Sequence, residues 1–342
     1  MKGFLNRVKF TEKDLALFKT LAKLNQTSLK SMLKRLLSSM DEYSVYNHKK
    51  YIAAKGNIPI VLVAHMDTVF PAPPNDFYYD SKKGALWSPD GLGADDRAGV
   101  FAILKIIGSG LRPHILFTCD EEIGGGGACE AADNKKFFGD VKYVIQLDRR
   151  GSNDCVFYDC DNEEFIKYVE NFGFQEAIGS FSDISIICPS WEVAGVNLSI
   201  GYHNEHSICE ILMVREMMAT VEKVKLMLQA KDVPDFIYVP SLRGVPYYNL
   251  FNQYGNYYKP FGFDRPLKCV NCGSDIDLVS MVEVEKSDGS LVSYCSSCIN
   301  TGNFNITWCY NCGCAYERRT DGTDRGLCYS CAGGYEFGPD ED

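Results

Sequence analysis

The chain has 342 residues, a hydrophobic content of 46% and a formal net charge of −10. This length accommodates one large domain and a smaller one, and no apolar run approaches the roughly 20 residues of a membrane-spanning helix. The N-terminus is charged throughout and lacks the apolar centre of a signal peptide, so we expect a cytoplasmic protein. The acidic balance repels phosphate backbones and argues against nucleic acid as a partner.

The first part of the chain predicts two amphipathic helices, a hairpin and a buried strand. Thr11-Glu-Lys-Asp14 has the spacing of a capping box and begins a helix that runs to about residue 24. Thr27 is the expected cap of a second helix, with an apolar face of Leu29, Met32, Leu33, Leu36 and Leu37. A hairpin is expected over residues 43–54, and the β-branched run 58–64 predicts a buried strand.

The middle of the chain alternates strands and helices. Residues 71–92 predict a loop with a short hairpin, 97–107 a helix, and 114–119, 141–147 and 193–200 core strands. Asp161 is the expected cap of a helix that closes at Gly173, and Ser207-x-x-Glu210 has the capping-box spacing of a long helix ending near residue 231. This order predicts an α/β fold, a three-layer sandwich with a mixed, mainly parallel sheet.

The composition changes after Val233, which suggests how the domains are divided. We expect a catalytic domain over residues 1–232 and a linker rich in Tyr, Asn, Pro and Phe over 233–267. A cysteine module follows over 268–335, and residues 336–342 form an acidic tail.

Acidic and imidazole side chains come just after the predicted buried strands. They lie in His65-Met-Asp67, Gly93-Ala-Asp-Asp-Arg-Ala-Gly99, Asp120-Glu-Glu-Ile-Gly124, Asp148 and His206. In an open α/β sheet, ligands bind at the carboxyl ends of the parallel strands, so we expect these side chains to converge. Lone carboxylates at the ends of apolar strands are costly unless they are paired or bind metal. The pattern therefore favours a metal site over a solvated charged face.

Hydrolysis of an amide near neutral pH needs a strong nucleophile and a place for the developing oxyanion. Two divalent ions about 3.5–4 Å apart supply both, and carboxylates and imidazoles are suitable ligands. We assign one ion to His65, Asp95 and Asp148, and the other to Asp95, Glu122 and His206, with Asp95 as the bridge.

Two further residues would assist these ligands. Asp67, two positions beyond His65 in an extended segment, would fix the orientation of the imidazole. Glu121, left free beside Glu122, is the natural general base for the bridging water. His203 lies three positions from His206 and is an alternative ligand, or a hydrogen-bonding or substrate-contacting residue.

The pattern resembles the clan of di-zinc exopeptidases that includes bacterial leucine aminopeptidase, tripeptidase T and glutamate carboxypeptidase, over roughly residues 1–230. The resemblance implies the same five ligands, Glu121 as general base, and a cis peptide between Asp95 and Asp96. The clan's Asn-x-His order favours His206 over His203 as the ligand. Gly179-Ser-Phe-Ser-Asp183 resembles the clan's Gly-Gly-Thr-Asp segment, so Asp183 is a candidate substrate contact.

The spacing departs from that of many clan members, which insert a lid or dimerisation domain before the last histidine. Only 58 positions separate Asp148 from His206. We therefore expect a compact catalytic domain without a lid. In this clan an aspartate at the position of Asp148 tends to accompany aminopeptidases, so the resemblance leans towards that activity.

Nine of the fifteen cysteines crowd into residues 269–331, mostly as Cys-x-x-Cys pairs, which in an intracellular protein indicate metal rather than disulfides. Such a small segment with little aliphatic core needs metal to fold. One four-thiolate zinc ribbon is expected from Cys269, Cys272, Cys295 and Cys298, and another from Cys309, Cys312, Cys328 and Cys331. Cys314 either replaces Cys312 or stays free.

Residues 268–342 contain 5 Lys/Arg and 12 Asp/Glu, so the module is acidic. This charge favours a structural or protein-contact role for the ribbons over nucleic-acid binding.

Three functions follow from these patterns. The first is a zinc-dependent exopeptidase, an aminopeptidase or small-peptide hydrolase, with two catalytic Zn²⁺ (replaceable by Co²⁺ or Mn²⁺) and two structural Zn²⁺. The second is an N-acyl amino acid deacylase or other amidohydrolase with the same site. The third is an inert scaffold that acts through its ribbons.

Overall fold

The structure, a computed structural model, describes residues 10–240, 267–276, 281–287, 291–295, 298–299, 306–308 and 315–319. The chain divides into two units, Met1–Gly244 and Val245–Asp342. Each unit has its own hydrophobic cluster. None of the helices among the described residues combines the length and apolar character that crossing a bilayer requires.

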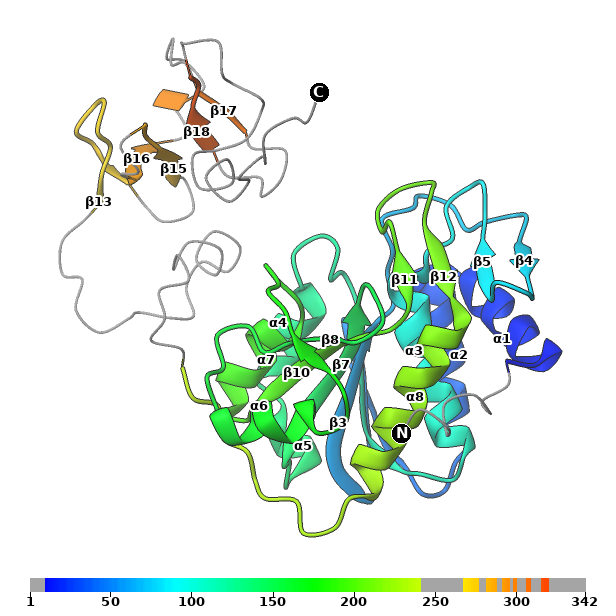
Figure 1. Cartoon of the computed structure of the whole chain (residues 1–342). Coiled ribbons are helices and arrows are strands. Elements are labelled where there is room, and N and C mark those ends of the chain that lie inside the picture. Colours follow the sequence, from blue (N-terminus) through cyan, green and yellow to red (C-terminus); the bar gives the residue numbers. More distant parts are fainter. Residues whose placement is uncertain are drawn as a thin grey trace, which may run out of the picture. The chain divides into compact units, whose positions relative to one another are not determined.

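An eight-stranded sheet runs through the first unit in the order β1-β2-β6-β3-β7-β10-β8-β9 (Figure 1). Its strands are β1 (Ser44–Asn47), β2 (Tyr51–Lys55), β3 (Ile58–His65), β6 (Pro113–Thr118), β7 (Tyr143–Arg149), β8 (Asp154–Val156), β9 (Gln175–Glu176) and β10 (Gly195–Ser199). The four central strands, β6, β3, β7 and β10, are parallel, whereas β2 and β8 pair with them in the antiparallel direction. The predicted mixed, mainly parallel sheet is confirmed.

Helices cover both faces of this sheet, which makes three layers. One hydrophobic cluster joins the sheet to α1 (Glu12–Ala22), α2 (Gln26–Ser38), α3 (Ala94–Gly108), α6 (Glu163–Glu170) and α8 (Val214–Gln229). The other joins it to α4 (Gly126–Ala132), α5 (Lys135–Phe138) and α7 (Ile184–Trp191). Figure 1 shows α3 and α8 on one side of the sheet and α4 and α7 on the other.

The strand β3 shows why the sequence pattern is continuous rather than alternating. Ile60 and Leu62 belong to the first cluster, and Val61 and Val63 belong to the second. Because successive side chains point to opposite faces and both faces are covered, every position must be apolar.

A second sheet supports the loop that carries His206. It is antiparallel, in the order β11-β12-β5-β4, and includes the short hairpin expected within residues 71–92. Its strands are β4 (Tyr78–Asp80), β5 (Ala85–Trp87), β11 (Tyr202–His203) and β12 (Ile211–Met213). His206 lies in the loop between β11 and β12.

One predicted helix start is confirmed, and the caps of two others lie at neighbouring residues. Thr11 and Asp14 form the predicted capping box of α1. The cap of α2 is Asn25 instead of Thr27, because the Asn25 side chain accepts from the N–H of Ser28. The cap of α6 is Asn162 instead of Asp161, since its side chain accepts from the N–H of Phe165.

The capping box predicted at Ser207-x-x-Glu210 is wrong. The helix α8 begins only at Val214, after β12, so residues 207–210 belong to the preceding loop. The Glu210 carboxylate instead accepts hydrogen bonds from the N–H groups of Ala94 and Asp95, at 3.0 and 3.1 Å. Its partner is therefore the start of α3.

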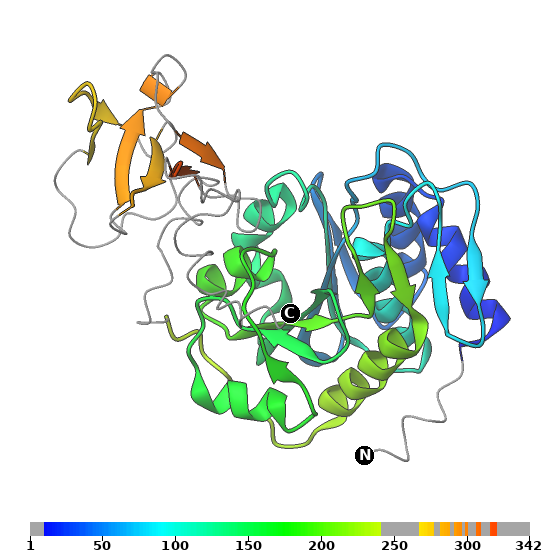
Figure 2. The same ribbon diagram turned by 45° about the horizontal axis from the view of Figure 1, so that its top comes forward.

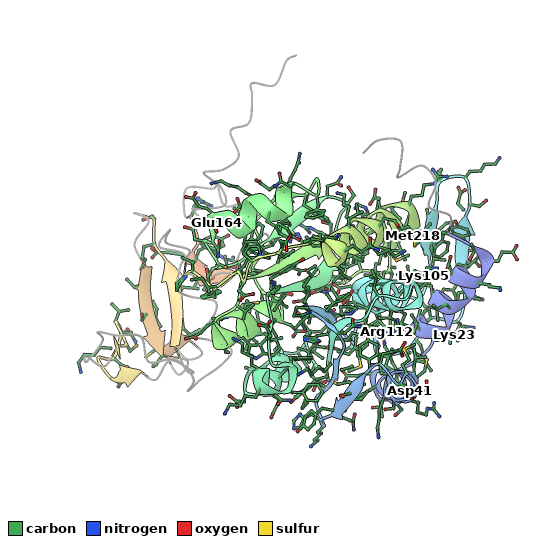
Figure 3. All side chains as sticks on the ribbon, turned by 90° about the horizontal axis from the view of Figure 1, so that it is seen from below. Lys23, Asp41, Lys105, Arg112, Glu164 and Met218 are labelled. Carbon is green, nitrogen blue, oxygen red and sulfur yellow. The ribbon has the colours of Figure 1, made fainter. Side chains whose placement is uncertain are left out.

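An ion pair joins α1 to α3. Lys105 Nζ lies 2.6 Å from Asp14 Oδ1, and Figure 3, which labels Lys105, shows α3 beside α1.

The chain between Asp148 and His206 forms β8, α6, β9, α7, β10 and β11, all of which belong to the first unit.

The described part of the second unit consists of short strands (Figure 2, yellow to orange-red). They are β13 (Leu267–Lys268), β14 (Asp275–Ile276), β15 (Met281–Glu285), β16 (Leu291–Cys295), β17 (Ile306–Trp308) and β18 (Ala315–Glu317). The last four form a sheet in the order β16-β15-β18-β17, and β13 pairs with β14. Cys269, Val284, Tyr294 and Ala315 are buried in its core.

His114 makes the first unit sensitive to acid. It is buried in β6, its Nδ1 accepts from the N–H of Gly56 at 3.1 Å, and its ring stacks on Phe138. Burial lowers the pKa of His114 to about 4. Its neutral form therefore contributes stability that is complete above pH 6.5 and is lost as the pH falls towards 4.

Between pH 7 and pH 5 we expect this group to reduce the free energy of unfolding by about 2 kcal/mol. The variant His114→Gln cannot become charged, so its stability should fall less over the same range in urea unfolding experiments. An equal fall in both proteins would contradict the assignment.

Candidate metal centre

The chemically active side chains gather at the carboxyl ends of the central strands. His65 is the last residue of β3, Asp148 lies near the end of β7, and Glu121 and Glu122 follow β6. Asp95 lies in the first turn of α3. Because β6, β3 and β7 are parallel neighbours, their carboxyl ends meet at the same edge of the sheet.

Asp95 lies between two histidines. Its Oδ1 is 3.1 Å from His65 Nε2, and its Oδ2 is 3.2 Å from His206 Nε2. His65 Nε2 is also 3.3 Å from Asp148 Oδ1, and His206 Nε2 is 3.0 Å from Glu122 Oε2. The two oxygens of one carboxylate therefore face two different sets of side chains, His65 with Asp148 and His206 with Glu122.

The geometry and donor set of this cluster fit metal ions. Ligand atoms of His65, Asp95 and Glu122 all lie within 4.8 Å of one another, as do those of His65, Asp96 and Asp148. Asp96 is already engaged, because its carboxylate accepts from the N–H groups of His65 and Gly99 at 3.2 and 2.7 Å. Glu122 Oε1 is buried and accepts no hydrogen bond, which leaves it available to a cation.

The electrostatics point the same way. Burial raises the pKa of Glu121 to about 10 and that of Asp148 to about 7. Hydrogen bonds to Asp95 and Glu122 raise the pKa of His206 to about 11. Burial thus opposes the charged form of these carboxyls, and a bound cation would compensate for that cost and favour the carboxylates. Nitrogen and oxygen donors of this kind suit zinc and related divalent ions.

Asp67 connects two of the strand ends. Its Oδ1 lies 3.3 Å from His65 Nδ1, and its Oδ2 accepts from the N–H of Glu122 at 3.0 Å. The peptide bond between Asp95 and Asp96 is cis, as the family resemblance implies.

Several residues that hold Asp148 were missed from the sequence. The carboxylate accepts from Gln146 Nε2 at 3.0 Å, Ser182 Oγ at 3.2 Å and the Tyr202 hydroxyl at 3.2 Å. The Asp148 N–H donates to Asn197 Oδ1 at 2.9 Å. The available signal was the presence of polar Gln146 and Asn197 inside otherwise apolar strands.

The turn that carries Glu121 and Glu122 is fixed by the N-terminal helices. Asp120 has a φ of 61°, an unusual value for a residue with a side chain. Gln26 Nε2 donates to Asp120 Oδ1 at 2.8 Å, and the Asp120 N–H donates to Gln26 Oε1 at 2.9 Å. Lys50 forms an ion pair with the other oxygen of this carboxylate.

Two predicted substrate contacts have other partners in the structure. His203 Nε2 lies 2.7 Å from Glu216 Oε2 on α8. Asp183 is fully buried and accepts from the Thr118 hydroxyl, and burial raises its pKa to about 6. A contact of either residue with substrate stays a prediction.

In the second unit, four cysteines come together. One ligand atom each of Cys269, Cys272, Cys295 and Cys298 lies within 4.8 Å of the others, and the Sγ atoms of Cys272 and Cys295 are 3.9 Å apart. The first pair flanks a turn in which the Gly273 N–H donates to the Cys269 carbonyl at 2.8 Å. The other predicted ribbon residues, Cys309, Cys312, Cys314, Cys328 and Cys331, lie outside the described residues.

No protein-family profile and no curated protein sequence matches the chain. Solved structures do match it. Aminopeptidase PepT from Bacillus cereus is 16% identical with a TM-score of 0.54, and a tripeptidase from Staphylococcus aureus is 15% identical with a TM-score of 0.52. Each match covers 64% of this chain and 98% of the other.

A TET aminopeptidase from a marine sediment archaeon of the Thaumarchaeota is 14% identical with a TM-score of 0.53. That match covers 65% of this chain and 98% of the other. The chain shares the fold of these peptidases. At such identities the likeness concerns the fold, and the chemistry must be argued from the side chains above.

The contact between Gln26 and Asp120 predicts a loss of stability when it is removed. We expect Gln26→Ala to lower the free energy of unfolding by about 2 kcal/mol, because two hydrogen bonds of about 1 kcal/mol each are lost. The neighbouring Thr27→Ala is the matched control. Thr27 is exposed and does not cap α2, so its change should stay within about 0.5 kcal/mol. Urea unfolding measures both, and equal losses would count against the assigned contact.

Proposed function

We propose that the chain is a metal-dependent peptidase, an exopeptidase of the aminopeptidase type. The observation that carries this proposal is the position of Asp95, with one carboxylate oxygen beside His65 and the other beside His206. A carboxylate in this position suits a bridge between two cations. The fold shared with three peptidases supports the same reading.

His65, Asp95 and Asp148 would hold one ion, and Asp95, Glu122 and His206 the other. Zn²⁺ is the proposed metal, with Co²⁺ or Mn²⁺ as substitutes. When bound, two such ions lower the pKa of a water molecule and stabilise negative charge on the substrate carbonyl. Asp67, 3.3 Å from His65 Nδ1, keeps the imidazole oriented for this task.

Glu121 is the proposed general base. It precedes Glu122 in the turn after β6 and is partly buried there. With cations held by the neighbouring ligands, their positive charge would lower the pKa of Glu121 below the value that burial alone gives. Its carboxylate would then accept the proton of the attacking water and return a proton to the leaving amine. The nitrogen of the cleaved bond therefore leaves as a neutral amine.

Access to the site would not require a lid. Every helix and strand between Asp148 and His206 belongs to the first unit, with β10 in its central sheet and α7 against one face. A peptide would then approach the carboxyl edge of the sheet directly. We propose that no lid domain is inserted between Asp148 and His206.

Replacing the general base tests this mechanism. We expect Glu121→Gln to retain metal, because Glu121 is not a proposed ligand, and to lower kcat on dipeptides by about 10²- to 10⁴-fold. Metal content by mass spectrometry and steady-state hydrolysis of Leu-Ala measure the two effects. Near-normal turnover in Glu121→Gln would rule out this role for Glu121.

A parallel assay with N-acetyl-leucine separates peptidase from deacylase. Turnover of Leu-Ala with little turnover of N-acetyl-leucine supports the aminopeptidase. The opposite result would replace it with a deacylase that uses the same site.

We further propose that Cys269, Cys272, Cys295 and Cys298 bind a structural Zn²⁺. Four thiolates within one coordination sphere suit tetrahedral zinc. We expect Cys272→Ser to lose one slowly exchanging zinc ion and to destabilise the second unit, since metal binding and folding are coupled in such modules. Cys209→Ser, which changes an exposed thiol of the first unit, is the matched control and should retain all zinc. Equal zinc content in the two variants would argue against the site.

A further inference from the structure

A cavity of about 460 Å³ lies beside the candidate metal centre. Asp67 and Glu122 form part of its wall, so the cavity and the centre share side chains. The rest of the wall comes from residues 22 and 24–26 around the α1–α2 connection, the loop after β3, residues 92–93, Arg97 of α3 and the turn after β6. Its apolar side chains include Ala22, Leu24, Val69, Phe70, Leu92 and Ile123, and three prolines of the segment 71–74 add to them.

The charged groups in this wall have partners, apart from one oxygen of Glu122, which is a proposed metal ligand. The Arg97 guanidinium donates to the carbonyl oxygens of Leu24, Met66 and Asp67. Asp120 is held by Gln26 and Lys50. The Asp67 carboxylate contacts His65 Nδ1 and accepts a hydrogen bond from the N–H of Glu122.

The surface offered to a ligand is therefore mostly apolar. A charged side chain placed here would lose hydration without gaining a new partner, whereas an apolar one gains from burial.

We propose that this cavity binds a bulky apolar side chain of the substrate, next to the bond that is cleaved. The inference rests on the proposed peptidase function and extends it to a substrate class, peptides with Leu or Phe beside the scissile bond. Glu122 connects the cavity to the metal centre: its Oε2 lies 3.0 Å from His206 Nε2, and its side chain also lines the cavity. A side chain flanking the reacting carbonyl would thus reach the cavity directly. The volume lies within the range of small-molecule sites.

Two dipeptide series test the preference, X-Ala and Ala-X, where X is Leu, Phe, Ser or Lys. With the metal-loaded full chain, we expect kcat/KM for Leu and Phe to exceed that for Ser by roughly 10- to 100-fold in one of the two series. Such a result also shows which side of the scissile bond the cavity serves.

Variants at the rim show whether the cavity is responsible. Val69 is 41% exposed and lines the cavity, whereas Leu226 on α8 is 43% exposed and does not. We expect Val69→Asp to lower kcat/KM for Leu and Phe by about tenfold while Ser peptides change little. Leu226→Asp adds the same charge elsewhere and should match the wild type. Val69→Trp, which narrows the cavity without adding charge, should penalise Phe more than Ser.

The outcomes separate this inference from the function on which it rests. Peptide hydrolysis without an apolar preference in either series would overturn the inference and leave the peptidase in place. The same conclusion follows if the Val69 variants behave like Leu226→Asp. If the metal-loaded wild type hydrolyses none of the peptides, the proposed function fails first.

Discussion

Buried negative charge at one edge of a parallel sheet is the constraint on which the first unit depends. Among the described residues, the imidazoles of His65 and His206 are the ones that contact the carboxylates of Asp95, Glu122 and Asp148. Further carboxyls lie nearby, those of Asp67, Asp96, Glu121, Asp183 and Glu210. Desolvation and mutual repulsion both oppose such an arrangement. It persists only where backbone N–H groups, hydroxyls or cations compensate for each carboxylate.

The structure divides these carboxylates between two tasks. Asp96, Glu210 and Asp67 accept backbone N–H groups and so fix the start of α3 and the turn after β6. Asp95, Glu122 and Asp148 instead present oxygens to His65 and His206. The first group thus holds the backbone that positions the second, which explains why acidic side chains outnumber the proposed metal ligands.

Local sequence patterns predicted what depends on local physics. The continuous apolar run of β3 follows from burial on both faces, and the Thr11–Asp14 capping box involves residues three positions apart. The cap errors at α2 and α6 are small local shifts, since Asn25 and Asn162 lie within two positions of the predicted caps. The larger error arose where a partner is remote. Glu210 pairs with N–H groups more than a hundred positions away, so its capping-box spacing from Ser207 was coincidental. Gln26 forms a hydrogen bond with Asp120, which lies 94 positions away in the sequence, and no local pattern predicts that pairing.

The turn after β6 connects the candidate metal centre with the cavity proposed to bind the substrate side chain. Its residue Asp120, held by Gln26 from α2, sets the path of the chain into Glu121 and Glu122. Glu122 faces His206 on one side and the apolar cavity on the other, and Ile123 continues the cavity wall. Gln26 begins α2, and the wall residues Ala22 and Leu24 lie at the end of α1 and in the α1–α2 connection. In the proposed function the N-terminal helices would therefore affect both catalysis and specificity. A change in how α2 packs would therefore shift the proposed metal ligand Glu122 and reshape the proposed subsite together.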